Sequence, residues 1–207
     1  MTVLNLVGHV NGQTAENQSA WLASWNKFFS FQQPLSLPNW FSTLVLAITG
    51  LAASELAAEQ RRAGERWISW EVIAGVFVLL SVDEAMSIHG RLGPLLGAVL
   101  SVPVVPWVVI AVALAMTFCL LMLPLLLSLP RPTALAMVLA GVLFVLGAAG
   151  VEAVEGLLPA GGLDLPNLVE EVLEMVGSAL FLVALVGYRD TVGRRQRAPL
   201  PSTERSA

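Results

Sequence analysis

The sequence predicts an all-α integral membrane protein, built as a bundle of five transmembrane helices. Hydrophobic residues make up 56% of the 207-residue chain and charged residues only 13%, whereas soluble domains carry roughly 25% charged residues. Between Leu92 and Pro130 the only side chain that can ionise is Cys119. A helix needs only about 20 apolar residues to cross a bilayer. We therefore expect these long apolar runs to lie in a membrane.

Five stretches reach the length that a bilayer demands. They cover about residues 38–57, 68–88, 107–127, 133–154 and 167–188. A proline in the first turn of a helix costs no hydrogen bond, and Pro38 and Pro106 stand at two of the predicted starts. Glycine and proline also punctuate the gaps between the stretches. Residues 37–190 are therefore predicted to form the five-helix bundle as a single domain.

The two flanking segments, residues 1–36 and 191–207, are expected to lie outside the bilayer. Four aromatic residues recur at helical spacing near the N-terminus, namely Trp21, Trp25, Phe28 and Phe29. Aromatic residues on one side of a short helix favour the lipid headgroup zone. Residues 20–32 are therefore predicted to form an interfacial helix on the outer face, with a loop carrying aromatic anchors as the alternative. The C-terminal segment is predicted to be a disordered cytoplasmic tail, since it is polar and carries prolines.

Lysine and arginine decide the orientation, because cytoplasmic loops retain positive charge. With five spans, nine of the eleven basic residues fall on one side: Arg61, Arg62, Arg66, Arg131, Arg189, Arg194, Arg195, Arg197 and Arg205. Only Lys27 and Arg91 fall on the other. The pattern predicts an N-terminus outside and a C-terminus in the cytoplasm, and four or six spans would break it.

Acidic side chains inside the apolar stretches point to a site, because a charge at the bilayer centre costs at least about 2.5–3.5 kcal/mol. Seven of them form three groups: Asp83 and Glu84, then Glu152 and Glu155, then Glu170, Glu171 and Glu174. The predicted topology puts all seven within roughly 10 Å of the outer boundary, with His89 at the same level. Glu55 and Glu71 belong to the inner ends of their spans and are expected to form at most a separate pair.

Helical spacing predicts which of these side chains can meet. Glu152 and Glu155 are three residues apart, and Glu174 follows Glu170 by four residues and Glu171 by three, so each helix offers carboxylates on one face. His89 follows Asp83 by six residues, which separates them by more than about 100° around a continuous helix. His89 is therefore expected to join the acids only if the helix unwinds near Gly90.

Many carboxylates at one depth need protons or a bound cation to balance their charge. Oxygen ligands with at most one imidazole suit calcium, magnesium, manganese or iron. The predicted divalent-metal ligands are Asp83, Glu84, His89, Glu152, Glu155, Glu170, Glu171 and Glu174. Among them Glu84, Glu174 and His89 are the candidate catalytic groups. The alternative is that acids near the boundary are solvated or favoured by a helix dipole, and that His89 is an interfacial residue without a ligand role.

Three segments carry a resemblance to a known group of proteins. Residues Ser81–His89, with Pro38–Ser42 upstream and Glu170–Gly177 downstream, resemble uncharacterised bacterial membrane proteins with a Leu-Asp-Glu-Ala-x-Ser-Ile-His-Glu-like stretch. The resemblance covers about residues 34–188. It implies a location in the bacterial inner membrane and brings no activity with it. Gly90 stands where that pattern has glutamate and Asn39 where it has threonine, so one acid of the pattern is missing here.

Three functions from different classes are compatible with these features. The first is a metal-dependent enzyme whose site opens to the outer face and takes a hydrophobic or lipid-like substrate. The second is a cation or proton transporter, although few polar residues continue the path toward the inner side. The third is an accessory subunit of a larger membrane complex. Partners beyond the lipid bilayer, including a homo-oligomer, stay open, and a net charge of −4 argues against nucleic acid.

Overall fold

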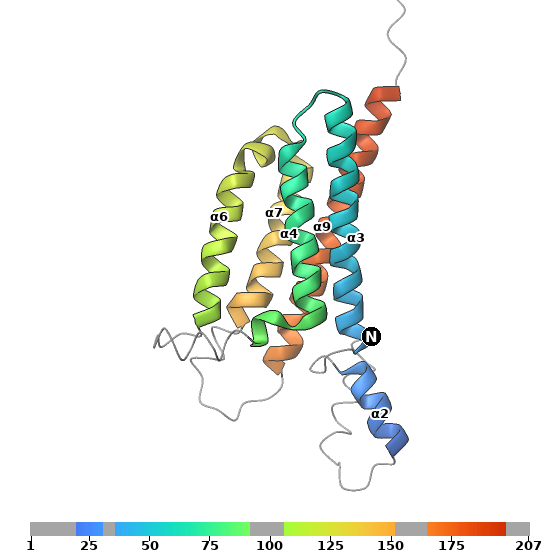
Figure 1. Ribbon diagram of the computed structural model, residues 1–207, viewed down its shortest axis with the longest axis vertical. Helices are drawn as coiled ribbons and strands as arrows, with labels where there is room; N and C mark the ends of the chain where they lie inside the picture. Colours follow the sequence, from blue (N-terminus) through green and yellow to red (C-terminus); the bar gives the residue numbers. More distant parts are fainter. Residues whose placement is uncertain (1–19, 31–35, 92–105, 152–164, 198–207) are drawn as a thin grey trace, which may run out of the picture.

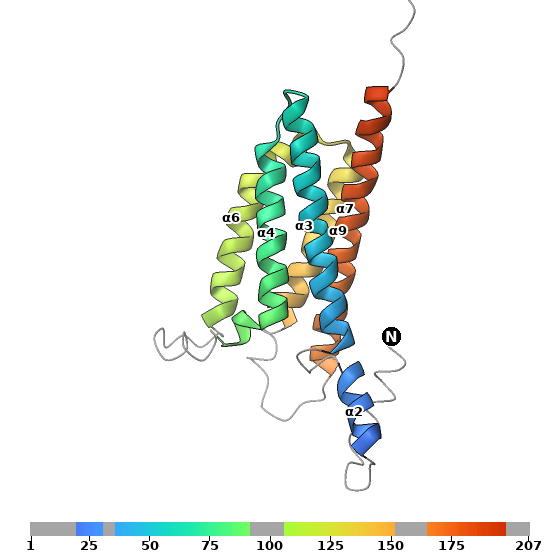
Figure 2. The same ribbon diagram turned by 45° about the vertical axis from the view of Figure 1, so that its right-hand side comes forward.

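The computed structural model describes residues 20–30, 36–91, 106–151 and 165–197, and within them it is helical and contains no strand. Five long rods run in alternating directions and lie side by side (Figure 1; Figure 2). The rods are α3 (Leu37–Arg62), α4 (Ile68–Met86), α6 (Pro106–Ser128), α7 (Arg131–Val145) continued by the π-helix η2 (Leu146–Val151), and α9 (Leu165–Arg197). A short helix, α2 (Ala20–Phe29), precedes them. The predicted all-α architecture is confirmed.

Three of the rods are long and apolar enough to cross a membrane: Leu37–Arg62, Val108–Ser128 and Arg131–Val151. On α6 the outward side chains Leu114, Leu120 and Leu127 are 61%, 67% and 78% exposed. A helix face of this kind is covered by lipid rather than by water. The chain is therefore a multi-pass membrane protein.

Local signals explain where α3 begins and ends. The hydroxyl of Ser36 accepts a hydrogen bond from the backbone N–H of Asn39 at 3.4 Å, and a proline stands in the first turn. At the other end Gly64 adopts φ +73°, and the N–H groups of Gly64 and Glu65 bond to the carbonyls of Arg61 and Gln60. This is the Schellman arrangement that ends a helix at glycine. It turns the chain tightly into α4.

The bundle is held by one apolar core that all five rods share. Phe77 of α4 packs on Phe181 of α9 with ring centroids 4.6 Å apart, and Trp70 stacks on Tyr188 at 5.4 Å. Leu56 and Leu185 are fully buried beside them. These contacts join α3, α4 and α9 through the middle of the bundle and toward one end.

Two glycines allow helices to approach more closely than other residues would. A methyl group at Gly50 of α3 would lie 2.9 Å from Cγ2 of Val78 in α4. At Gly177 of α9 it would lie 2.8 Å from the Ala140 carbonyl oxygen and 2.7 Å from the Phe144 nitrogen, both in α7. Small residues at such crossings are how membrane helices pack.

Several predicted boundaries differ from those observed. The fourth stretch, predicted as a plain helix to residue 154, changes to a π-helix at Leu146, and residues beyond Val151 lie outside the described parts. Helix α9 continues to Arg197, so it includes residues 191–197 of the segment predicted to be a tail. Helix α2 covers most of the predicted interfacial helix, and its Trp25 and Phe28 are exposed.

Candidate functional site

The bundle has two chemically different ends. We call one the acidic end: there α3 and α9 begin and α4 finishes, and Asp83, Glu84, Glu171 and Glu174 lie on α4 and α9. It is at the bottom of Figure 1. We call the opposite one, with the α3–α4 turn and the last turns of α9, the basic end. The predicted site residues that the structure describes belong to the acidic end.

A break in α4 brings His89 back to Asp83. Ser87 adopts the left-handed conformation, with φ 48° and ψ 51°, and its N–H bonds to the Asp83 carbonyl. The chain then begins a new helical turn over residues 88–91. The backbone N–H of His89 donates to Oδ1 of Asp83 at 2.9 Å, and the imidazole Nδ1 lies 2.7 Å from Oδ2. The helix therefore does unwind near Gly90, as the pairing requires, and the break itself is at Ser87.

Asn39 connects α3 to the end of α4. Its side-chain Nδ2 donates to the Glu84 carbonyl oxygen at 3.0 Å and to Glu84 Oε1 at 2.9 Å. The last carbonyls of a helix have no partner within the helix, so the amide satisfies one of them and orients the carboxylate at the same time. The sequence places Asn39 at this depth but does not assign it a role. The role of Asn39 could have been suspected from the sequence, because its amide stands at a helix start, at the depth of the predicted acids.

The acids of α9 face those of α4. Glu84 is close enough to interact electrostatically with both Glu171 and Glu174, and Glu171 also interacts with His89. Glu170 lies within the same range of Glu171 and Glu174. The structure thus brings the predicted second and fifth stretches together at one end. The remaining predicted ligands, Glu152 and Glu155, lie outside the described residues.

The π-helix packs directly on this part of α9. A methyl group at Gly147 would lie 2.9 Å from Cγ of Glu174 and 2.8 Å from the Glu170 carbonyl oxygen. Only glycine permits this approach without displacing one of the helices. π-helical turns occur frequently at functional sites. Here the turn fixes the stem of Glu174.

Two buried polar atoms at the acidic end have no hydrogen-bond partner among the described residues. They are Oγ of Ser42, a residue only 3% exposed, and Oε2 of Glu171. Ser42 follows Asn39 by three residues and belongs to the buried face of α3. Buried polar groups are normally paired, and leaving one unpaired costs about 1–3 kcal/mol. The two atoms are therefore suited to receive a ligand group.

The expectation of a metal centre finds no support in the described ranges. Within them, no group of three or more histidine, cysteine, aspartate or glutamate side chains could hold a metal ion. The contacts seen are pairs instead: His89 with Asp83, and Asn39 with Glu84.

Apolar side chains close the bundle between the acidic end and the middle of the helices. Leu46, Phe77 and Phe181 are buried there. The buried hydroxyls of Thr49 and Ser178 bond to carbonyls of their own helices, at 2.7 and 3.1 Å. In the described helices, these apolar side chains and internally bonded hydroxyls therefore lie between the acidic end and the basic end.

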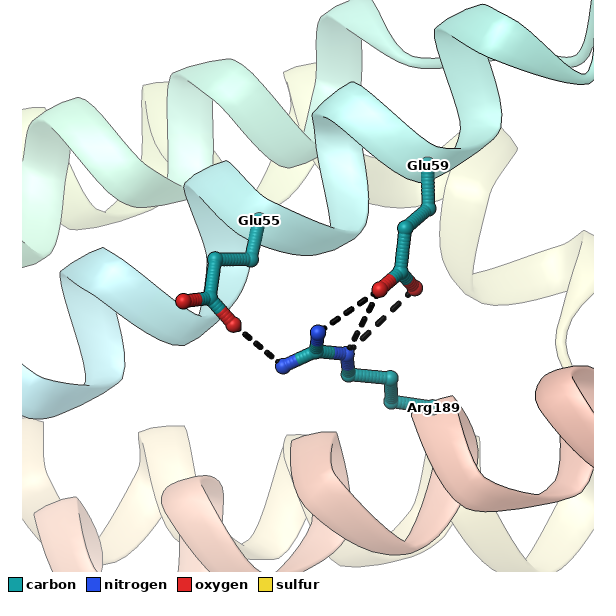
Figure 3. Close-up of polar contacts among 3 residues, drawn as sticks. All are labelled: Glu55, Glu59 and Arg189. Carbon is teal, nitrogen blue, oxygen red and sulfur yellow. Dashed lines mark hydrogen bonds and ion pairs between the residues drawn. The ribbon is translucent and has the colours of Figure 1, made fainter.

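At the basic end, one arginine joins α9 to α3. Arg189 donates from Nη2 to Glu59 Oε1 at 2.6 Å, and from Nε to the same carboxylate at 3.1 and 3.3 Å (Figure 3). Its Nη1 also bonds to Glu55. Hydrogen bonding to Glu59 raises the pKa of the Arg189 guanidinium above its ordinary value. Glu55 thus pairs with Arg189, whereas the sequence allowed at most a pair with Glu71, which is exposed.

Comparison with known proteins gives one match. A family model described as a domain of unknown function (DUF8692) matches residues 1–187. Neither the curated proteins nor the solved structures give a significant match.

Proposed function

The chain belongs to this family, DUF8692, and we propose that it is a membrane-embedded enzyme with its active site at the acidic end. The substrate is a hydrophobic or lipid-like molecule that reaches the site from the bilayer. The reaction is acid–base chemistry, in which side chains move protons on the bound substrate. The observation that carries this proposal is the pairing of Asp83 with His89.

An imidazole held by a carboxylate at one ring nitrogen has a fixed tautomer and orientation. The 2.7 Å contact between His89 Nδ1 and Asp83 Oδ2 has this geometry. In the proposed reaction, His89 accepts a proton through its other nitrogen, Nε2. Asp83 holds the ring and stabilises the charged form. A proton taken by His89 is later released to solvent at this end.

Two further side chains of the proposed active site come from α9 and α4. Glu174, whose stem packs against Gly147, donates a proton to the substrate and is then reprotonated from solvent at this end. Glu84 is oriented by its hydrogen bond from Asn39 at 2.9 Å and lies within electrostatic range of Glu174. Ser42 Oγ and Glu171 Oε2, which have no hydrogen-bond partner among the described residues, are proposed to position polar groups of the substrate. The headgroup of a lipid-like molecule offers such groups, while its apolar part remains in the bilayer.

The apolar side chains between the acidic end and the basic end favour an enzyme over a transporter. A transport path needs polar groups on both sides of the membrane and between them. Phe77, Phe181 and the stack of Trp70 on Tyr188 occupy that route. A site reached from one side fits this arrangement better. Ion flux in proteoliposomes tests the alternative, and proton or cation flux through the wild-type protein would favour it.

The proposal includes the predicted topology. We propose that α4 and α9 also span, that the acidic end lies on the outer face of a bacterial inner membrane, and that α2 rests in the headgroup zone. The support is the distribution of arginine, which favours the cytoplasmic side. Six arginines whose side chains are described lie at the basic end: Arg61, Arg62, Arg66, Arg131, Arg189 and Arg194.

A divalent metal could bind at the acidic end only if residues outside the described ranges supply further ligands. Glu152 or Glu155 would have to complete a ligand set with the pairs described above, and the bound ion would act as a Lewis acid. Elemental analysis of the purified protein tests this. A stoichiometric metal that is lost in both Asp83→Asn and Glu174→Gln supports it, and a metal-free, active protein removes it.

The test of the enzyme proposal uses the native host with the gene deleted. Profiling its lipid extract is expected to reveal a hydrophobic species that accumulates. The wild-type gene is expected to restore the profile, and so is Glu71→Gln, the control substitution on α4 at the basic end. His89→Gln and Glu174→Gln, made at equal levels, are expected to fail. An unchanged profile after deletion, or full restoration by His89→Gln, would contradict the proposal.

A further inference from the structure

A second candidate site lies at the basic end, far from the chemistry proposed above and independent of it. A pocket with a volume of about 380 Å³ opens between α3 and α9. Five residues line it: Glu59, Arg189, Asp190, Gly193 and Arg194. Ligand sites commonly have volumes of about 300–1,000 Å³. The pocket is therefore large enough for a small polar group.

Some of the charged side chains that line the pocket already pair with each other, and others are available to a ligand. The Arg189 guanidinium is engaged by Glu59 and Glu55 (Figure 3). Asp190 and Arg194 are exposed, and among the described residues neither forms an ion pair. They are four residues apart on α9 and so lie on one side of the helix. The pocket thus presents one anion and one cation side by side.

The position of the pocket fits a lipid headgroup. It begins directly after Tyr188, whose ring stacks on the buried Trp70 and packs against the apolar core. The apolar part of α9 ends there, and the charged turns begin. Gly193 lines the pocket, and the space in front of it is open, because a methyl group at this position would meet nothing within 4 Å.

We propose that this pocket binds the zwitterionic headgroup of a phosphatidylethanolamine lipid. The guanidinium of Arg194 contacts the phosphate, since arginine matches phosphate oxygens in charge and geometry. The primary ammonium contacts the carboxylate of Asp190. A headgroup without an ammonium would leave Asp190 facing the phosphate, and a trimethylated ammonium could not donate hydrogen bonds to this carboxylate.

The experiment is native mass spectrometry of the full-length protein in detergent, titrated separately with phosphatidylethanolamine, phosphatidylglycerol and phosphatidylcholine. The wild type is expected to retain phosphatidylethanolamine best, by about fivefold, the factor that one exposed ion pair of about 1 kcal/mol supplies. Gly193→Leu fills the pocket and is expected to abolish this preference. Gly187→Leu is the matched control, because this exposed glycine of α9 also has open space around it. It is expected to bind like the wild type.

Asp190→Asn removes the partner of the ammonium and leaves the pocket open. It is expected to bind phosphatidylethanolamine and phosphatidylglycerol equally. Two results would overturn the proposal: equal binding of the two lipids by the wild type, or unchanged phosphatidylethanolamine binding in Gly193→Leu. Soluble glycerophosphoethanolamine at the same concentration is not expected to compete. Competition by it would show that the ligand is a free phosphoester and not a lipid.

Discussion

At the residue scale, one backbone conformation creates the most distinctive feature of the acidic end. A continuous helix would keep His89 and Asp83 on different sides, because they are six residues apart. The left-handed turn at Ser87 reverses this, and both the backbone and the ring of His89 then contact the carboxylate. Among the described residues, Ser87 is the only non-glycine residue with a positive φ. Strained conformations of this kind gather at functional sites.

The conformation at Ser87 can be tested by two substitutions. A left-handed residue other than glycine costs about 1–2 kcal/mol. The free energy of unfolding of Ser87→Gly is therefore expected to equal that of the wild type or to exceed it by up to about 1 kcal/mol. Valine is β-branched and disfavours this conformation, so the free energy of unfolding of Ser87→Val is expected to be about 1–2 kcal/mol lower than that of the wild type. Unfolding in mixed detergent micelles measures both, and a valine variant as stable as the glycine variant would contradict the conformation.

At the element scale, the helices could be predicted from the sequence but their contacts could not. Apolar length and proline positions gave α3, α4 and α6 to within a few residues. Periodicity cannot detect a π-helix, which differs from an α-helix only in its hydrogen-bond register, and so η2 was missed. The positions of the glycines in the helices are known from the sequence. Which of them touch a neighbour depends on packing between helices that are distant along the chain.

Two glycines on neighbouring helices therefore give opposite predictions. Gly177→Ala is expected to destabilise the protein by about 1–3 kcal/mol, because the added methyl group meets the α7 backbone at 2.7 Å. Gly141→Ala on α7 meets nothing within 4 Å and is expected to be neutral or up to about 1 kcal/mol stabilising. Unfolding in detergent compares the two variants. Equal effects would mean that α7 and α9 do not cross at Gly177.

At the scale of the whole molecule, the ion pairs found in the described parts of the chain lie at the two ends of an apolar bundle. The sequence predicted this separation, because depth follows from the position of each acid within its stretch. It also placed Asp83, Glu84, Glu171 and Glu174 at one end, where the structure has them. It did not reveal the partner of Glu55, because no spacing rule connects that residue to Arg189 across 134 positions. The pairing depends on how far α9 continues past the apolar core.

The proposed orientation gives a prediction for the whole chain. In a Cys119→Ser background, single cysteines replace Lys27 near the acidic end and Glu65 at the basic end, both exposed residues. A membrane-impermeant maleimide is expected to label Lys27→Cys in right-side-out vesicles and Glu65→Cys only after permeabilisation. The opposite pattern would reverse the orientation. Labelling of both sites in intact vesicles would place both ends on the same side and remove the five-span topology.

The central claim is that Asp83 holds the imidazole of His89 at the acidic end, and nitrogen NMR of histidine tests it most directly. The chain has two histidines, so His9→Gln leaves His89 as the only labelled ring. The expected spectrum shows a single state with the proton on Nδ1, hydrogen-bonded to the carboxylate. Asp83→Asn is expected to replace it with a mixture of tautomers. Identical spectra from the two proteins would contradict the claim.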